Sequence, residues 1–125
     1  MDEIFARNVL YWGDEAQKII ASSHIAVFGL GGVGGFCAEA LARSGVGELT
    51  LVDFDKVSKS NINRQIIALN STVGMYKTEL FEIRLRDINP DIKLHLINDF
   101  YLEDFDFSGI NYTADALSLI HISEP

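Results

Sequence analysis

Residues 25–35 read IAVFGLGGVGG, and this stretch decides the fold of the chain. An apolar run ends here at a cluster of glycines, and a segment with apolar residues at helical spacing follows it. Gly45 and Gly47 then stop the helix, and a second apolar run at residues 49–52 leads to Asp53. We therefore expect a strand, a glycine turn, a helix and a second strand within residues 25–53.

The glycines and Asp53 together predict a nucleotide-binding site. Gly29 permits a tight turn after the strand, Gly31 lets the backbone approach a phosphate, and Gly34 lets the helix pack close to the sheet. The first N–H groups of the helix, aided by the helix dipole, face the bound anion. Asp53 ends the second strand at the distance where a carboxylate accepts hydrogen bonds from ribose hydroxyls. Glycines that served only close packing would leave Asp53 unexplained.

The rest of the chain continues the alternation of strands and helices. A helix is expected at residues 77–88, a third strand at 93–99 and the start of a fourth at 112–116. This alternation is typical of α/β proteins with a parallel sheet. We therefore predict a Rossmann-like, doubly wound, mainly parallel sheet that is incomplete, because it ends before a second half.

Residues 1–23 carry weaker signals. We expect an N-terminal arm that docks through Leu10, Tyr11 and Trp12, followed by a helix. Asp14 is the expected N-cap of that helix, with Gln17 as its capping-box partner.

Composition limits the classes of function. The chain has 125 residues, 48% of them hydrophobic, which suits one domain with a packed core. Its formal net charge of -8 repels nucleic acid, so contact with RNA needs a local basic patch or a segment outside this sequence. The single cysteine, Cys37, excludes an internal disulfide and a four-cysteine zinc site, and we interpret it as a core residue. The absence of a signal peptide and of a membrane-length apolar run favours a reducing, cytoplasmic location.

A second set of residues distinguishes this chain from a plain dinucleotide-binding protein. It lies in the polar loop after the second strand and at the start of the next helix, and it comprises Asn61, Asn63, Arg64, Gln65 and Lys77. Ligands of such sheets bind at the carboxyl ends of the strands, so this loop is expected to lie over the phosphates. Arginine and lysine there would neutralise a triphosphate, which carries more charge than the pyrophosphate of a dinucleotide. The set therefore favours ATP over NAD.

These motifs resemble those of a known family, the ThiF-type ATP-dependent activating enzymes, which are related to the ubiquitin-activating enzymes. The resemblance covers residues 25–98 and rests on GLGGVG at 29–34, LVDFD at 51–55, SNINRQ at 60–65, VG at 73–74 with Lys77, and INP at 88–90. Within the family, the segments FGLGGVG, NINRQ and DFY (residues 99–101) look most similar to the tRNA threonylcarbamoyladenosine dehydratases. Arg7 with Gly13 resembles the N-terminal arm of the family, whose arginine reaches the ATP of the partner subunit in a dimer.

The resemblance implies a reaction in which ATP, bound with Mg²⁺, activates a carboxylate. The carboxylate attacks the α-phosphorus of ATP and forms an acyl-adenylate and pyrophosphate. For the dehydratases, the carboxylate is that of a threonyl group carried by tRNA, and ring closure with loss of AMP follows. The same resemblance implies a homodimer for the full-length protein.

Family roles are carried over by position. Gly32 and its neighbours meet the phosphates, and Asp53 binds ribose. Asn61 and Arg64 hold phosphates, while Lys77 supports them at the reacting end, where cations spread the charge of the departing pyrophosphate. The complete set of nucleotide-binding candidates is Gly29, Gly31, Gly32, Gly34, Asp53, Asp55, Asn61, Asn63, Arg64, Gln65 and Lys77, and the catalytic candidates are Arg64, Lys77 and Arg7.

The C-terminal part departs from the family pattern. The aspartate that holds Mg²⁺ in the family is expected three residues after Asp115, and Ser118 stands at that position, so no metal ligand is assigned. From about Leu117 the sequence resembles translated sequencing-adapter read-through. We therefore expect a ThiF-type nucleotide-binding domain at residues 1–116 and a non-native tail at 117–125, in a truncated fragment that is inactive in adenylation.

Two alternatives stay open. Other adenylating enzymes of this kind act on the C-terminus of a ubiquitin-like sulfur-carrier protein, and they carry a downstream pair of C-x-x-C zinc motifs in a region outside this sequence. A nicotinamide-dependent dehydrogenase or a plain dinucleotide-binding module would explain the glycine turn, but not Arg64, Gln65 and Lys77 together.

Overall fold

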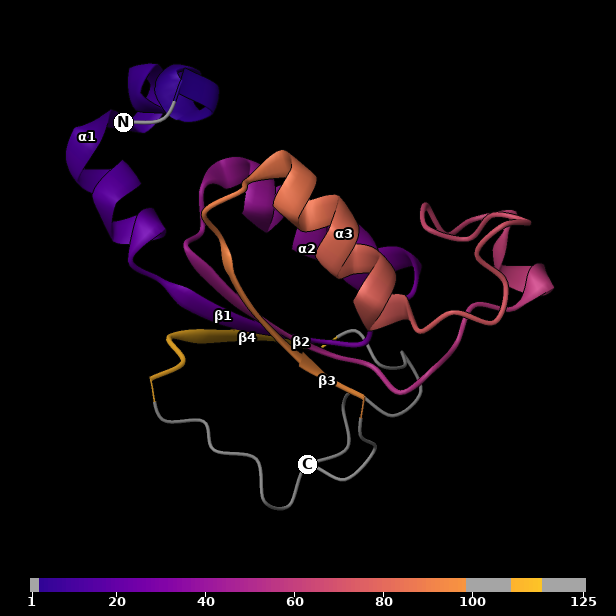
Figure 1. Ribbon diagram of the computed structural model, residues 1–125. Coiled ribbons are helices and arrows are strands. Elements are labelled where there is room, and N and C mark those ends of the chain that lie inside the picture. The colour runs from indigo at the N-terminus through magenta and orange to yellow at the C-terminus, as the bar shows by residue number, and fades with distance from the viewer. Residues whose placement is uncertain (1–2, 99–108, 116–125) are drawn as a thin grey trace.

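A computed structural model describes residues 3–98 and 109–115, and it contains a four-stranded parallel sheet (Figure 1). The strands are β1 (His24–Phe28), β2 (Glu48–Val52), β3 (Lys93–Ile97) and β4 (Tyr112–Asp115). Their order across the sheet is β3-β2-β1-β4, and all neighbouring pairs are parallel. The predicted Rossmann-like parallel sheet is therefore confirmed. The expected domain boundary at residue 116 lies outside the described residues.

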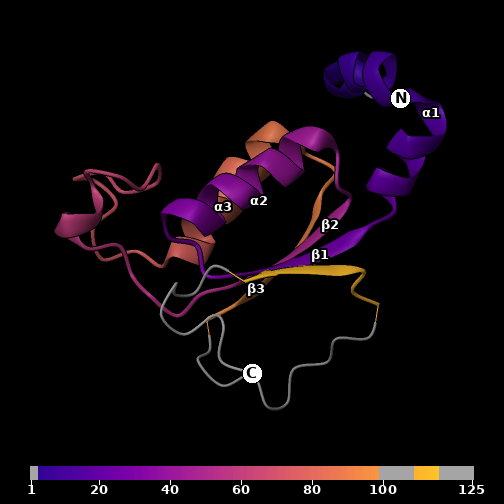
Figure 2. The same ribbon diagram turned by 180° about the vertical axis from the view of Figure 1, so that it is seen from behind.

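Two helices cover one face of this sheet (Figures 1 and 2). They are α2 (Gly32–Ser44) and α3 (Lys77–Ile88), and the second has the predicted bounds. Because side chains alternate along a strand, every second residue of β1 and β2 faces the helices. Val27, Leu49 and Leu51 point that way into the main core, where they meet Phe81 and Leu85 of α3.

A smaller apolar cluster lies on the opposite face of the sheet. It consists of Ala26, Phe28 and Val52, with Ile97 and Ile110 packed against it. Toward the amino ends of the strands this face becomes polar. None of the helices in the described ranges is both long and apolar enough to cross a membrane.

The N-terminal segment lies apart from the sandwich of helices and sheet, at the amino ends of the strands (Figure 1). It contains a short 3-10 turn, η1 (Glu3–Phe5), and α1 (Ala6–Ala21), which is kinked at Gly13 with φ 84° and ψ 167°. The predicted docking by Leu10 and Tyr11 is wrong, because these side chains are 83% and 82% exposed.

Hydrogen bonds from Asn8 and Gln17 to the carbonyl oxygen of Ser44, together with packing of Ile20 against the main core, attach this segment to the rest of the chain. Trp12 donates its indole N–H to Oε1 of Gln17 at 2.8 Å, and Nε2 of Gln17 donates to the carbonyl oxygen of Ser44 at 3.0 Å. Gln17 is 3% exposed, so its amide must find partners inside the protein. Its side chain thus joins α1 to the end of α2 and leaves the predicted capping box with Asp14 without support.

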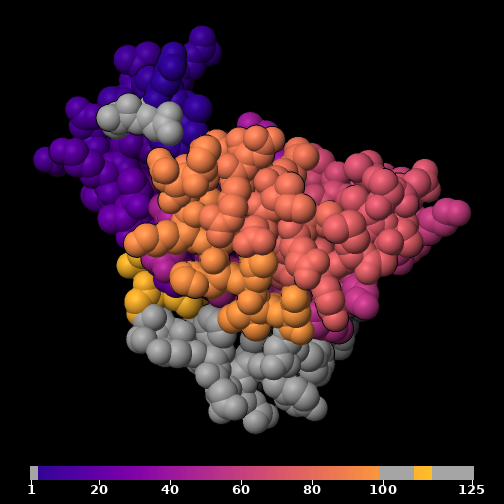
Figure 3. Space-filling view, viewed as in Figure 1, coloured from indigo at the N-terminus to yellow at the C-terminus, as the bar shows by residue number. Residues whose placement is uncertain are grey.

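The crossover segment between β2 and α3 lies at the other end of the molecule from α1. In the space-filling view it forms a lobe at the end opposite the N-terminal segment (Figure 3). Val57, Ile67 and Ala68 of this crossover are buried in the main core. The crossover also closes on itself, because the N–H of Val57 donates to the carbonyl of Met75 at 2.8 Å. It is therefore an anchored structure, which includes the 3-10 turn η2 (Lys59–Asn61).

Gly47, just before β2, tests how tightly the segments at the amino ends of the strands are packed. A Cβ atom on Gly47 would collide with the backbone carbonyl oxygen of Ala21, and the carbonyl of Gly47 itself accepts the N–H of Lys93 at 2.9 Å. We expect Gly47→Ala to lower the free energy of unfolding by about 1–3 kcal/mol, because the backbone must shift to make room. Urea unfolding measures this. Gly32→Ala is the matched control, because a Cβ there meets nothing within 4 Å; an equal loss in both variants would contradict the packing argument.

Candidate nucleotide-binding site

The glycine turn joins the carboxyl end of β1 to the start of α2. Gly29 has φ 90°, a conformation that glycine adopts without strain, and its N–H donates to the carbonyl of Val52 at 2.7 Å. The helix α2 then begins at Gly32 with no side-chain cap from Gly31 and no acidic residue in its first turn. Its first backbone N–H groups are therefore suited to bind an anion, with support from the helix dipole.

Asp53 holds the glycine turn in place. Its Oδ2 accepts the N–H of Leu30 at 2.6 Å and its Oδ1 accepts the N–H of Asp55 at 2.7 Å. The residue is 5% exposed. The carboxylate thus ties the turn after β1 to the turn after β2, a structural role that the sequence analysis did not foresee. Each oxygen retains a second lone pair for a further donor.

Asp55 and Lys77 form a charged pair beside this turn. The carboxylate of Asp55 is 55% exposed, and its Oδ2 lies 4.0 Å from Nζ of Lys77, whose side chain is 6% exposed. The backbone N–H of Lys77 also donates to the carbonyl of Asp55 at 3.2 Å. Thr78, the next residue of α3, donates its hydroxyl to Oδ1 of Asn98 at the end of β3. These bonds fix the start of α3 at the carboxyl edge of the sheet.

Gln65 lies over the glycine turn and has an unused acceptor. Its Nε2 is 3.6 Å from the position that a Cβ of Gly31 would take, and its Oε1 is buried with no hydrogen-bond partner among the described residues. Gln65 as a whole is 8% exposed. Because a buried amide oxygen without a partner is unfavourable, it points to a donor group from outside the described residues, such as a bound ligand.

The remaining crossover candidates bond mainly within their own loop. Asn61 is 8% exposed, and its Oδ1 accepts the N–H of Ser58 at 2.9 Å. Arg64 is exposed, and its Nη1 donates at 3.0 Å to the carbonyl of Ser60 and to Oδ1 of Asn63. Asn61 thus shapes the loop, and Asn63 orients the guanidinium of Arg64.

The structure brings most of the predicted residues to one edge of the sheet. The residues that meet there are Gly29, Gly31, Asp53, Asp55, Gln65 and Lys77, with Gly32 and Gly34 in the first turn of α2. The other three candidates, Asn61, Asn63 and Arg64, lie in the crossover after β2 and bond within it. Arg7 does not join them, because α1 lies at the opposite end of the sheet (Figure 1). Ser118 lies outside the described residues.

Sequence reasoning missed two contributors to this edge. The first is Gly35, where a Cβ would lie 2.8 Å from Cζ of Phe81, so the absent side chain lets α2 approach α3 closely. The second is the hydroxyl of Thr78 with its partner Asn98. The position of Asn98 directly after a strand was the available signal, because polar residues at the carboxyl ends of parallel strands meet at the ligand edge.

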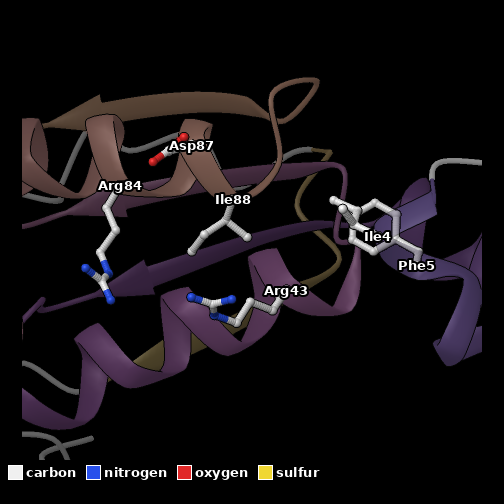
Figure 4. A pocket seen from close by; sticks show the side chains of 6 residues that line it. All are labelled: Ile4, Phe5, Arg43, Arg84, Asp87 and Ile88. Atoms are coloured by element: carbon white, nitrogen blue, oxygen red, sulfur yellow. The ribbon is translucent and has the colours of Figure 1, made fainter.

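A cavity of about 550 Å³ lies elsewhere, between η1 and the C-terminal halves of α2 and α3 (Figure 4). It is lined by Ile4, Phe5, Arg43, Arg84, Asp87 and Ile88. Its two arginines already pair with Glu39, Arg84 at hydrogen-bond range and Arg43 at 3.5 Å. The hydrogen bond from Arg84 holds the pKa of Glu39 below its ordinary value, so this carboxylate stays ionised and occupies both guanidinium groups. The cavity is therefore a packing gap beneath the N-terminal segment and a poor anion site.

Comparison with known proteins gives a consistent family. The profile of the ThiF family matches residues 5–118 of the chain. The tRNA threonylcarbamoyladenosine dehydratase of Bacillus subtilis (strain 168) is 47% identical over 121 residues, which are 93% of this chain and 47% of that protein. The molybdopterin-synthase adenylyltransferase of Haemophilus influenzae is 41% identical over 96 residues, which are 77% of this chain and 38% of that protein.

A solved structure extends this similarity to the fold. The E. coli tRNA N6-threonylcarbamoyladenosine dehydratase, crystallised in complex with ATP, matches with a TM-score of 0.87 and 40% sequence identity. The match covers 91% of this chain and 49% of that one. The chain thus spans about half the length of the relatives it matches.

Proposed function

The chain belongs to the ThiF family, and from this premise we propose that the whole protein uses ATP to activate a carboxylate by adenylation. The proposed substrate is the threonyl carboxylate of a threonylcarbamoyl-modified adenosine in tRNA, which the enzyme closes to a ring. The similarity to tRNA threonylcarbamoyladenosine dehydratases supports this choice of substrate. With ATP and tRNA as its substrates, the proposed enzyme would act in the cytoplasm, which is the location that we propose.

The buried acceptor of Gln65 is the observation that supports the nucleotide most directly. The Nε2 atom of the same amide lies 3.6 Å from the position that a Cβ of Gly31 would take, and α2 begins after Gly31 without a side-chain cap. A ligand that brings hydrogen-bond donors and several negative charges fits these features together. ATP has both, through its adenosine and its triphosphate, so the residues present fit this ligand.

We assign the charged groups of this edge to different parts of ATP. The N–H groups around Gly32 would bind phosphate oxygens, as would Arg64 from the crossover. Lys77 would act at the reacting end, because its buried ammonium has a fixed position beside Asp55. For ribose, the exposed carboxylate of Asp55 is better placed to accept hydrogen bonds than that of Asp53, both of whose oxygens already accept backbone N–H groups.

The chemical role of these residues is to stabilise developing charge. In adenylation the substrate carboxylate attacks the α-phosphorus, and pyrophosphate leaves with additional negative charge. Fixed cations near that position lower the barrier, because they interact more strongly with the transition state than with bound ATP. The first step then needs no nucleophile from the protein. Mg²⁺ would enter with the phosphates of ATP, and no residue of the described chain is assigned to it.

The position of Arg7 supports a dimeric enzyme. Arg7 is exposed on α1, at the end of the sheet away from the glycine turn. An arginine that serves its own nucleotide site from there would have to cross the whole sheet. In a homodimer the same side chain would reach the site of the other subunit, which is the arrangement that we propose.

A second substrate class has its own support. The similarity to molybdopterin-synthase adenylyltransferases favours the C-terminus of a ubiquitin-like sulfur-carrier protein as the activated carboxylate. The two substrates use the same ATP chemistry and differ only in the carboxylate. They are separated by supplying each to a version of the chain extended to the length of its relatives. A nucleoside lighter by one water, formed together with AMP, supports the tRNA substrate, and pyrophosphate exchange that needs the carrier protein contradicts it.

The preference for ATP over NAD can be tested on this chain, and the position of the phosphates can be tested with one substitution, Gly32→Ala. We expect equilibrium dialysis to detect ATP binding in preference to NAD, and Gly32→Ala to lower the ATP affinity by about tenfold, or about 1.4 kcal/mol. The added methyl group meets no protein atom within 4 Å, so its effect falls on the bound phosphate and not on the fold. Equal binding of NAD and ATP would favour a dinucleotide-binding module, and unchanged ATP affinity in Gly32→Ala would place the phosphates elsewhere.

A further inference from the structure

Three polar side chains that the nucleotide site does not use meet on the sheet face opposite α2 and α3. They are His24 at the start of β1, Glu48 at the start of β2 and His95 in the middle of β3. His24 pairs in register with Glu48, and His95 pairs with Thr50, two residues further along β2. All three alternate with residues of the main core, so they point away from it. They lie toward the amino ends of the strands, whereas the nucleotide site lies at the carboxyl ends.

The geometry of this group resembles a set of metal ligands. Nε2 of His95 lies 2.6 Å from Oε2 of Glu48, and Nδ1 of His24 lies 3.6 Å from the same oxygen. One nitrogen or oxygen from each residue lies within 4.8 Å of the other two. The two imidazole rings are 5.4 Å apart between centroids. Two nitrogen donors and one carboxylate oxygen thus converge on one point.

Thr50 gives His24 the support that a metal-binding histidine usually has. Its Oγ1 lies 2.7 Å from Nε2 of His24. When Nε2 carries the proton and donates it to Thr50, the lone pair of Nδ1 points toward Glu48. Histidines that bind metals commonly donate the second ring N–H to an oxygen in this way, which fixes the ring and its tautomer.

We propose that His24, Glu48 and His95 bind a divalent transition-metal ion of the zinc type. Two histidines and a carboxylate are a common donor set for Zn²⁺, which leaves a fourth position for water. Zinc needs ligand atoms about 2.0–2.2 Å from the ion, so the three side chains have to open only slightly around it. An ion can reach the group from solvent, because the side chains of His24, Glu48 and His95 are 15%, 31% and 52% exposed.

The local charges also favour a cation. Glu48 is the one carboxylate of the group, and its negative charge would offset part of the charge of the ion. Both histidines are uncharged when they bind a metal. Lys93, which pairs in register with Glu48, is the basic group that opposes the ion. Its side chain is exposed to solvent, where its charge is screened.

A zinc titration of the metal-free chain tests this site. We expect Zn²⁺, in competition with a chromophoric chelator, to bind with one equivalent per chain. His95→Ala and Glu48→Gln are each expected to lower the affinity at least tenfold. Glu48→Gln keeps the shape of the side chain and loses its charge, and His95 is half exposed, so both variants should fold; circular dichroism checks this.

Two control variants remove the remaining histidine and the cysteine of the chain. His121→Ala removes the third histidine of the chain, which lies outside the described residues, and Cys37→Ser removes its thiol. Neither should change the affinity. A Co²⁺ spectrum should also lack thiolate charge-transfer absorption. The proposal is overturned when no stoichiometric binding occurs, or when His121→Ala or Cys37→Ser lowers the affinity as much as His95→Ala.

Discussion

Replacing Lys77 with methionine is expected to lower carboxylate-dependent ATP–pyrophosphate exchange by about 10²–10³-fold, in a version of the chain extended to the length of its relatives. The ATP affinity should fall much less. Lys77 is 5% exposed, and its ammonium lies 4.0 Å from the carboxylate of Asp55, so the charge is held in one place. A fixed cation stabilises the departing pyrophosphate more than it stabilises bound ATP, because the negative charge is greatest in the transition state. Pyrophosphate exchange and equilibrium dialysis measure the two quantities.

The controls separate this effect from misfolding and from a general change of charge. Methionine keeps most of the buried stem of the lysine and removes only its charge. Lys18→Met makes the same change on the exposed end of α1, at the other end of the sheet, and should leave exchange unaltered. Arg64→Ala is expected to act in the same direction as Lys77→Met. Variants that lose ATP affinity but keep their turnover would show that Lys77 and Arg64 only bind the nucleotide.

The sequence was sufficient for the strands and helices around the nucleotide site because their signals are local. Gly29 adopts the positive φ that a tight turn needs, and Gly45 ends α2 in the left-handed conformation that glycine favours. Helix α3 begins at Lys77 and ends at Ile88, as its apolar spacing and the following Asn89-Pro90 indicate. Each of these features depends on a few neighbouring residues, so the positions of these turns and helix ends can be predicted from the sequence alone.

The N-terminal segment was predicted incorrectly because its structure depends on distant partners. Gly13 interrupts the helical pattern, and Leu10 and Tyr11 before it stay exposed. Asn8 and Gln17 help to attach the segment, because both donate to the backbone carbonyl of Ser44, which is 36 and 27 residues away. No periodicity indicates such a bond. The sequence did not predict the group of His24, Glu48 and His95 for the same reason. The group forms only when three strands pair in one register.

The edge of the sheet at which most candidate residues lie was easier to predict than the role of each residue. Their positions at the ends of strands place them at one edge, which sequence order predicts. Which atoms remain for a ligand depends on hydrogen bonds that only the folded chain defines. Gln65 has a buried side-chain oxygen without a partner among the described residues, whereas the side-chain oxygen of Asn61 accepts the N–H of Ser58. Asp53 is the clearest example, since the same carboxylate that suggests ribose binding also holds the glycine turn.

Asp53→Ala is therefore expected to reduce stability and ATP binding together. The change removes the acceptors of two backbone N–H groups, one of them buried, and each loss costs about 1–3 kcal/mol, so the free energy of unfolding should fall by about 2–6 kcal/mol. The ATP affinity should fall by about ten- to a hundred-fold, because the turn that holds the phosphates loses its support. Urea unfolding and equilibrium dialysis measure the two effects.

Asp55→Ala separates the structural contribution from direct contact with the ribose. Its carboxylate is more than half exposed and accepts none of the backbone bonds that hold the turn, but it pairs with the buried ammonium of Lys77. Its loss should therefore lower the free energy of unfolding less than Asp53→Ala does. If Asp55 accepts the ribose hydroxyls, the ATP affinity of this variant still falls by about tenfold, and an analogue without those hydroxyls binds the variant and the original chain equally well. An unchanged ATP affinity in Asp55→Ala would assign ribose binding to Asp53. The carboxylate of Asp53 would then accept hydrogen bonds from the ribose and from the turn at the same time.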